Sequence, residues 1–155
     1  LLDAFIVYEE NRMSNKREFE RMMWARRFAL QGLYEWQVSQ CQVEEVERHL
    51  AENPDFVKAN REAFSNMVRG AIRGQAEANE LIEPLLDRPI DQLDLVEKAV
   101  LWLGCYELLT HPETPYKVII NESVNLAKKF GGDQSYKFIN GVLDKVAKKV
   151  RIDYQ

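Results

Sequence analysis

Apolar residues recur at helical spacing through most of the chain. From about Lys16 to Gln40 no proline interrupts the pattern, and at about 100° per residue the apolar side chains fall into one sector of a helical wheel. These side chains are Phe19, Met22, Ala29, Leu30, Leu33 and Trp36. Similar patterns predict helices near residues 43–50, 64–82, 95–109, 115–130 and 135–150.

The absence of any strand pattern sets the fold class. No segment alternates apolar and polar residues with a period of two, so we expect an all-α fold, an antiparallel bundle of about six or seven helices. Residues 95–109 are apolar nearly all round, which predicts a central buried helix. Gly131-Gly132 is a stop signal for the helix that Pro115 begins, and Asp133 or Ser135 can cap the last helix.

The first residues of the chain do not join this pattern. Residues 1–11 mix apolar and acidic side chains without a period, and could be a native extension, a strand-like arm or a non-native remnant. We therefore expect an N-terminal extension of unclear role over residues 1–15 and a single helical domain over residues 16–155. The 155 residues, 46% of them hydrophobic, are enough for one domain with a real core.

Nothing in the sequence directs the chain to a membrane or out of the cell. No stretch approaches the roughly 18 apolar residues of a membrane span, and the N-terminus lacks the pattern of a signal peptide. We expect a cytoplasmic protein without membrane contact. Cys41 and Cys105 lie far apart in the sequence, so we expect both to be reduced and structural.

The net charge of −4 hides an asymmetry along the chain. Residues 12–27 carry six Lys or Arg against two Glu, which gives +4, and residues 128–151 carry seven against two acidic residues, which gives +5. Residues 42–122 hold sixteen Asp or Glu against eight Lys or Arg, which gives −8. We expect a dipolar molecule with one face suited to a polyanion and an acidic body.

No motif for catalysis, metal or cofactor binding is found. His49 and His111 stand in separate segments without partners at ligand spacing, and the chain has no glycine-rich phosphate loop. Glu77, Glu80 and Glu83 line up on one helix face, as either a solvated stripe, paired catalytic carboxylates or a surface for a basic partner. We favour the non-enzymatic interpretations and expect neither metal nor cofactor.

The basic N-terminal helix holds the strongest candidate chemistry. Clustered cations bind phosphates by releasing counterions, and exposed rings can stack on unpaired bases at about 1 to 3 kcal/mol each. The helical wheel places these cations in one arc, with two rings projecting into it: Lys16, Arg17, Arg21 and Arg27, with Trp24 and Phe28. Arg26 falls in the apolar sector, where a charge needs a carboxylate partner, unless the helix begins later. A merely solvated basic face is the competing interpretation.

Four motifs follow one another in order along the chain. The first consists of Ala25-Arg26, Ala29-Leu30-Gln31, Leu33-Tyr34 and Trp36-Gln37. The second and third consist of Val96-Glu97-Lys98-Ala99-Val100-Leu101 with Tyr106-Glu107-Leu108, and Pro115-Tyr116-Lys117-Val118 with Ile120-Asn121-Glu122 and Leu126-Ala127-Lys128. The fourth is Lys137-Phe138-Ile139-Asn140-Gly141-Val142-Leu143-Asp144-Lys145. Together they resemble the signatures of the NusB family, from about residue 16 to the end of the chain.

The resemblance implies an all-helical domain of two small bundles and a role in transcription antitermination. It implies binding of the boxA element of nascent RNA, together with small-subunit ribosomal protein ten, in the transcription elongation complex of ribosomal RNA operons. The family binds RNA through an arginine-rich N-terminal segment and the start of the last helix. Arg26 matches the family arginine, and the last-helix contacts match Ser135, Lys137 and Phe138.

The chain departs from the family pattern in one place. Where several arginines commonly precede the Ala-Arg pair, this chain has Met22-Met23-Trp24. RNA affinity is therefore weaker, or Trp24 substitutes stacking for charge. The same apolar cluster could let the free protein form a homodimer through its RNA face.

The acidic middle of the chain is the expected site for the basic ribosomal protein. We expect this contact at Glu80, Glu83 and Glu107.

Two alternatives remain open from the sequence. A NusB-like domain also precedes the catalytic part of some ribosomal RNA cytosine methyltransferases, which would make this chain the RNA-binding portion of an enzyme. The second alternative is a helical scaffold that binds only proteins, with a basic face that is merely solvated.

Overall fold

The computed structural model describes all 155 residues and contains only helices. The α-helices are α1 (Leu2–Ser39), α2 (Val43–Ala51), α3 (Arg61–Arg73), α4 (Gln75–Ile82), α5 (Leu95–Thr110), α6 (Tyr116–Phe130) and α7 (Ser135–Val150). Short 3-10 helices are η1 (Pro54–Lys58), η2 (Glu83–Leu85) and η3 (Ile90–Gln92). The all-α prediction is confirmed. None of the helices has the length and apolar character needed to cross a membrane.

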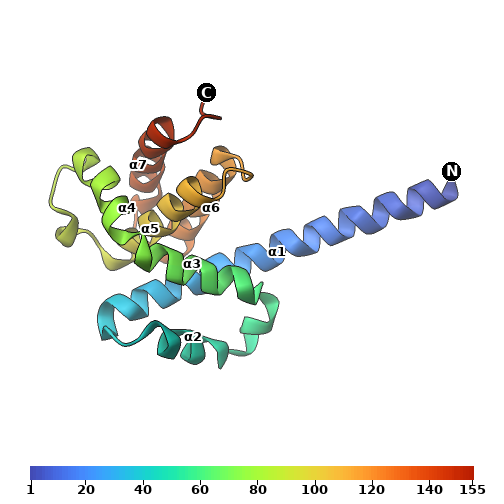
Figure 1. Ribbon diagram of the computed structural model, residues 1–155, viewed down its shortest axis with the longest axis horizontal. Coiled ribbons are helices and arrows are strands. Elements are labelled where there is room, and N and C mark those ends of the chain that lie inside the picture. Colours follow the sequence, from blue (N-terminus) through green and yellow to red (C-terminus); the bar gives the residue numbers. More distant parts are fainter.

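The helices form two groups that meet along α1 and α5. Helices α2 and α3 pack on α1, whereas α6 and α7 pack on each other and on α5, with α4 also on α5. Helix α5 contacts α1 and α3 as well, so it joins the two groups. Figure 1 shows this compact body and the N-terminal part of α1 extending far away from it.

Helix α5 is the central buried helix that the sequence predicts. Its buried residues occupy almost all sides, from Ala99 through Leu108. Asp94 fixes its start, because its carboxylate accepts hydrogen bonds from the backbone N–H groups of Val96 and Glu97 at 2.7 and 3.2 Å. The first turn of α5 is held next to α1 by Gln37, whose side-chain nitrogen donates to the carbonyl oxygen of Leu95 at 3.0 Å.

The start of α1 differs from the prediction. The helix begins at Leu2 and not near Lys16, so residues 2–11 are helical and do not form a strand-like arm. Side chains up to Arg21 are exposed almost throughout, and even Phe19, which the wheel placed inward, is 52% exposed. The apolar sector becomes buried only from Met22 onward, because the body of the protein begins there.

Two other local predictions are wrong. The pattern over residues 64–82 forms two helices, because the chain leaves helical geometry at Gly74, with φ −88° and ψ 7°. The last helix is not capped by Asp133 or Ser135. Its N-cap is Gln134, in the left-handed region with φ 69°, and no side chain accepts the cap hydrogen bond.

The C-terminal tail closes the loop between α5 and α6. The buried Arg151 guanidinium donates hydrogen bonds to four backbone carbonyl oxygens at 2.6 to 3.4 Å, that of Leu108 near the end of α5 and those of His111, Pro112 and Thr114 in the loop. Buried carbonyls need such partners, and a guanidinium offers five donors in a fixed fork. The tail therefore fixes the exit of α5 and the start of α6.

The close packing of α5 on α7 gives a test of the fold. A Cβ at Gly104 would lie 2.7 and 2.9 Å from the two δ-carbons of Leu143, whereas one at Gly141 would meet nothing within 4 Å. We expect Gly104→Ala to lower the free energy of unfolding by about 1 to 3 kcal/mol through overpacking. Gly141→Ala, on the exposed side of α7, should raise it by about 0.5 to 1 kcal/mol. Urea unfolding followed by circular dichroism measures both, and equal effects would contradict this packing.

Candidate nucleic-acid interface

One face of α1 presents polar and aromatic side chains at intervals of three or four residues from Arg17 onward, with Lys16 beside its first member. We call this face the α1 stripe; it consists of Lys16, Arg17, Glu20, Trp24, Arg27, Gln31 and Tyr34. Because a helix turns once in 3.6 residues, these side chains lie above one another on one side. All are exposed or half-buried, so the stripe is open to solvent along its whole length.

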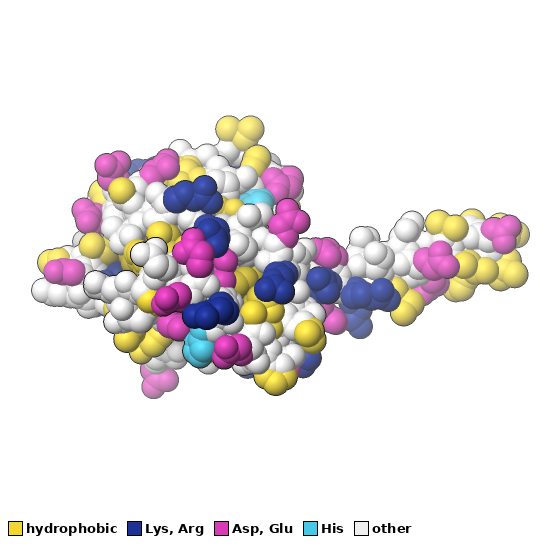
Figure 2. Space-filling model, turned by 60° about the horizontal axis from the view of Figure 1, so that its bottom comes forward, with side chains coloured by type: hydrophobic (Ala, Val, Ile, Leu, Met, Phe, Trp, Pro, Cys, Tyr) yellow, Lys and Arg dark blue, Asp and Glu magenta, His cyan; other side chains and the backbone are white.

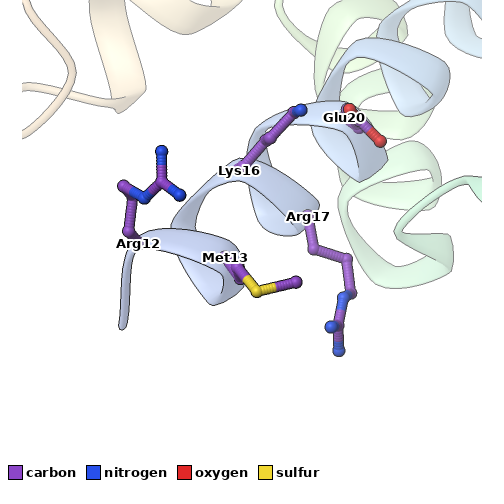
Figure 3. A pocket seen from close by; sticks show the side chains of 5 residues that line it. All are labelled: Arg12, Met13, Lys16, Arg17 and Glu20. Carbon is purple, nitrogen blue, oxygen red and sulfur yellow. The ribbon is translucent and has the colours of Figure 1, made fainter. Parts of the chain in front are cut away.

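The cations of the α1 stripe have no carboxylate partner. The ion pairs of the protein leave Lys16, Arg17 and Arg27, and the neighbouring Arg21, without an acidic oxygen within 4.0 Å. Figure 3 shows the neighbouring residues Lys16 and Arg17 on α1, with their charged ends directed to different sides of the helix. Figure 2 shows Lys and Arg gathered where α1 leaves the body, with hydrophobic and acidic side chains towards the tip.

Trp24 lies between two cations from different elements. The guanidinium carbon of Arg27 is 5.1 Å from the ring centre, and Nζ of Lys58, at the end of η1, is 4.8 Å from it. Asn60 holds this loop in place, because its N–H donates to the carbonyl of Arg21 and its amide nitrogen to Glu18, both at 3.1 Å. Sequence reasoning missed Lys58, since no local pattern links it to α1.

Phe28 is not part of this surface. The wheel placed it in the basic arc, but the ring is 1% exposed and packs edge-on against Phe56, with ring centres 5.2 Å apart. The loop that contains η1 covers this side of α1, which a wheel of one helix does not take into account. Phe28 is therefore a core residue, and its ring cannot stack on a base in this conformation.

Arg26 and Glu107 form a buried ion pair between α1 and α5. The Nε of Arg26 donates to both carboxylate oxygens of Glu107 at 3.1 and 3.2 Å, and an η-nitrogen donates to one of them at 2.8 Å. The two residues are 7% and 4% exposed. From the sequence we expected Arg26 to contact RNA and Glu107 to contact a protein. In the structure the two side chains instead face each other inside the molecule. The expectation that Arg26 needs a carboxylate is confirmed.

The surroundings of Arg26 stabilise its charge. Burial by itself lowers the pKa of the guanidinium, but the hydrogen bonds and negative charge of Glu107, together with the charge of Glu122, outweigh it and raise the pKa above its ordinary value. Glu122, on α6, is also buried. The charged cluster therefore connects three helices, and it belongs to the core.

The start of α7 brings together the other expected RNA contacts. Ser135 is 8% exposed, and its hydroxyl donates to Glu97 of α5 at 3.1 Å, so it fixes the helix start and offers little surface. Lys137 is exposed, and Phe138 is half-buried below the guanidinium carbon of Arg88, 5.6 Å from the ring centre. Sequence reasoning did not single out Arg88.

The remaining acidic candidates are open to solvent. Glu80 on α4 and Glu83 at the start of η2 are both exposed, and neither forms an ion pair.

The buried Cys105 is not a reactive thiol. Burial raises the pKa of its thiol to about 12, so this cysteine stays protonated and is a poor nucleophile near neutral pH.

The comparisons with known proteins identify relatives of this chain. The model of the NusB family matches residues 23–148. A transcription antitermination protein NusB of Ralstonia nicotianae is 50% identical over 127 residues, which is 82% of either protein, and that of Alcanivorax borkumensis is 44% identical over 127 residues, 82% of this chain and 85% of that protein.

Solved structures support the same relationship. NusB of T. maritima superposes with a TM-score of 0.73 at 28% identity, over 83% of this chain and 91% of that one. A crystal structure of the antitermination factors NusB and NusE in complex with double-stranded RNA contains a chain with a TM-score of 0.71 and 30% identity, over 82% of this chain and 96% of that one.

The buried ion pair predicts an asymmetric pattern of stability. Glu107→Ala leaves the Arg26 charge buried and unpaired, so we expect a loss of about 3 to 5 kcal/mol in the free energy of unfolding. The double variant Arg26→Met with Glu107→Leu should recover most of this loss, because apolar side chains of similar size need no partner. Urea unfolding is the measurement, with the exposed Glu80→Ala as control. A Glu107→Ala protein as stable as this control would contradict a buried pair.

Proposed function

Because the chain belongs to the NusB family, we propose that it is an RNA-binding adaptor of transcription antitermination and not an enzyme. In this proposal it binds boxA-type nascent RNA of ribosomal RNA operons. It does so together with small-subunit ribosomal protein ten, as part of the transcription elongation complex. The structure of NusB and NusE with RNA supports an assembly of this kind, because its NusB chain shares the fold of this protein.

The observation on which the RNA proposal rests is the set of unpaired cations on α1. Lys16, Arg17, Arg21 and Arg27 are free of carboxylate partners on a helix that leaves the body of the protein. Such cations repel one another unless an anion lies between them, and a phosphate chain satisfies several at once. The acidic body does not neutralise this surface, although the net charge is −4.

Trp24 favours unpaired RNA over a duplex. A base can stack on a ring only where it is not already stacked and paired within a helix, and adjacent cations then bind the flanking phosphates. Arg27, which has no carboxylate partner, stands beside the Trp24 ring in this way, and so does Lys58, whose Nζ also pairs with Asp55 at 3.1 Å. We propose that Trp24 replaces, by stacking, some of the charge that the family commonly places at this point. In the same proposal, Lys137 and Phe138 at the start of α7 also contact the RNA.

The proposed protein partner binds at the exposed acidic residues of α4 and η2. Glu80 and Glu83 remain candidates because both carboxylates are exposed and unpaired, unlike Glu107. A basic ribosomal protein would be oriented by this negative surface before contact. A homodimer of the free protein through the RNA face also remains a proposal; Met22, Met23 and Trp24, on which it would depend, are only half-buried.

The RNA proposal predicts a steep dependence of affinity on salt. For single strands the slope of log K against log salt is about −0.7 for each phosphate contact, so Arg17→Ala with Arg27→Ala should make it shallower by about 1.4. Fluorescence anisotropy with boxA RNA, a scrambled strand and a duplex, each at several salt concentrations, gives the slopes.

The matched control for these two arginines is Lys148→Ala with Lys149→Ala, which removes the same charge from the far end of α7. This control should keep the slope of the unaltered protein. If both double variants change the slope equally, net charge and not the α1 stripe governs binding. If the unaltered protein binds boxA RNA no better than the scrambled strand, boxA specificity is wrong.

The partner proposal predicts slower association after charge reversal. Glu80→Lys with Glu83→Lys should lower the association rate with small-subunit ribosomal protein ten by about 10-fold or more at low salt, with a smaller effect at high salt. Surface plasmon resonance measures this rate. Glu62→Lys, an exposed carboxylate on α3, is the control. If this control slows association equally, either the interface lies elsewhere or the rate depends only on the net charge of the protein.

A further inference from the structure

The first half of α1 exposes apolar side chains on a helix that leaves the body of the protein. We call residues 2–21 of α1 the projection (Figure 1). In proteins most helix stability comes from packing of an apolar face, so such a surface indicates packing against another helix. The large apolar side chains of the projection are between 45% and 72% exposed: Leu2, Phe5, Ile6, Val7, Tyr8, Met13 and Phe19.

One face of the projection has the spacing of a coiled coil. Its residues recur at alternating steps of three and four, which brings them onto one side of the helix. They are Leu2, Phe5, Glu9, Arg12, Lys16 and Phe19. The face is apolar at both ends and charged in the middle, and it is about 26 Å long at 1.5 Å per residue. A second helix of matching pattern can pack along it.

The charge of the projection changes sign along its length. Residues 1–11 carry three acidic and no basic side chains, which gives −3, whereas residues 12–21 carry four Lys or Arg against two Glu, which gives +2. Two projections side by side in the same direction would place like charges together. In opposite directions, the acidic part of each lies beside the basic part of the other. Charge complementarity therefore favours an antiparallel pair of two copies.

The coiled-coil spacing gives one register in which the charges of such a pair match. Its contacts, each made twice by symmetry, are Leu2 with Phe19, Phe5 with Lys16, and Glu9 with Arg12. A shift of one heptad in either direction would place Glu9 opposite a phenylalanine. Glu9 and Arg12 already pair at 2.7 Å within one helix, so two copies bring four charges of alternating sign to the centre. Polar residues at such a position specify register at a cost in stability, so we expect a reversible dimer.

We propose that two copies of this chain associate through their α1 projections, paired antiparallel over residues 2–19. The two bodies then lie at opposite ends of the pair (Figure 1). This surface excludes Met22, Met23 and Trp24, on which a dimer through the RNA face would depend. It also lies outside residues 23–148, which match the family model, and it does not depend on the proposed function.

Sedimentation equilibrium of the full chain at several concentrations tests the association. Phe5→Ala should raise the dissociation constant of the dimer by about 30-fold or more, because each dimer loses two aromatic anchors. Val7→Ala is the matched control, since the helical wheel places this exposed residue on the opposite side, and it should dimerise like the unaltered protein. A protein that stays monomeric up to about 1 mM, or a Phe5→Ala dimer as tight as the unaltered one, would overturn the proposal.

Exchange of the central charges tests the register. Glu9→Arg and Arg12→Glu should each prevent self-association, because each places like charges opposite one another. An equimolar mixture of the two variants should dimerise, since opposite charges then face each other again. Glu10→Arg makes the same change of charge at an exposed position beside the face, so this control should still dimerise. If Glu10→Arg disrupts the dimer as strongly as Glu9→Arg, net charge governs association and the central contact is wrong.

Disulfide crosslinking tests the direction of the pair. The background is Cys41→Ser, in which the remaining Cys105 is buried. Leu2→Cys mixed with Phe19→Cys should crosslink on mild oxidation, because these positions face each other. Leu2→Cys alone should not, since its two copies lie about 26 Å apart in an antiparallel pair. Crosslinking of Leu2→Cys with itself would show a parallel pair and refute the proposal. Circular dichroism confirms that each variant is folded.

Discussion

The ion pair between Arg26 and Glu107 determines how the rest of the molecule is arranged. It joins α1 to α5 inside the protein, at the place where the two groups of helices meet. A buried guanidinium tolerates few positions of its partner, because desolvation is offset only with good hydrogen-bond geometry. The pair and the buried apolar residues of α1 are satisfied together at one rotation of this helix about its axis, and that rotation decides which of its side chains face outward.

The exposed stripe of α1 is a consequence of that rotation. With Arg26 and Phe28 turned inward, Trp24 and Arg27 remain half-buried at the surface and Tyr34 is exposed. The neighbouring loop then adds Lys58 to the same surface. The candidate RNA surface thus depends on packing as well as on the number of basic residues. Packing buries Arg26 in the core and leaves Arg27 of the same helix at the surface.

The sequence predicted the helices well, since a period of 3.6 in apolar residues is a local property. It failed where the outcome depends on contacts distant in sequence. Phe28 looked accessible because a single-helix wheel contains no η1 loop. Lys58 was overlooked because the Trp24 ring beside it lies on another element. Arg26 is instructive, since its place in the apolar sector already indicated a buried partner, and only the resemblance to a family suggested a role on the surface.

The C-terminal tail and the first part of α1 bear on where a minimal folded fragment can be cut. The family match spans residues 23–148, which excludes Arg151 with its hydrogen bonds to the α5–α6 loop, as well as Lys16, Arg17 and Arg21. A fragment trimmed to the matched span would remove the Arg151 donor from the carbonyls of the α5–α6 loop at one end and most of the α1 cations at the other. A fragment with the boundaries of the family match would therefore lack parts of both the folded body and the candidate nucleic-acid surface.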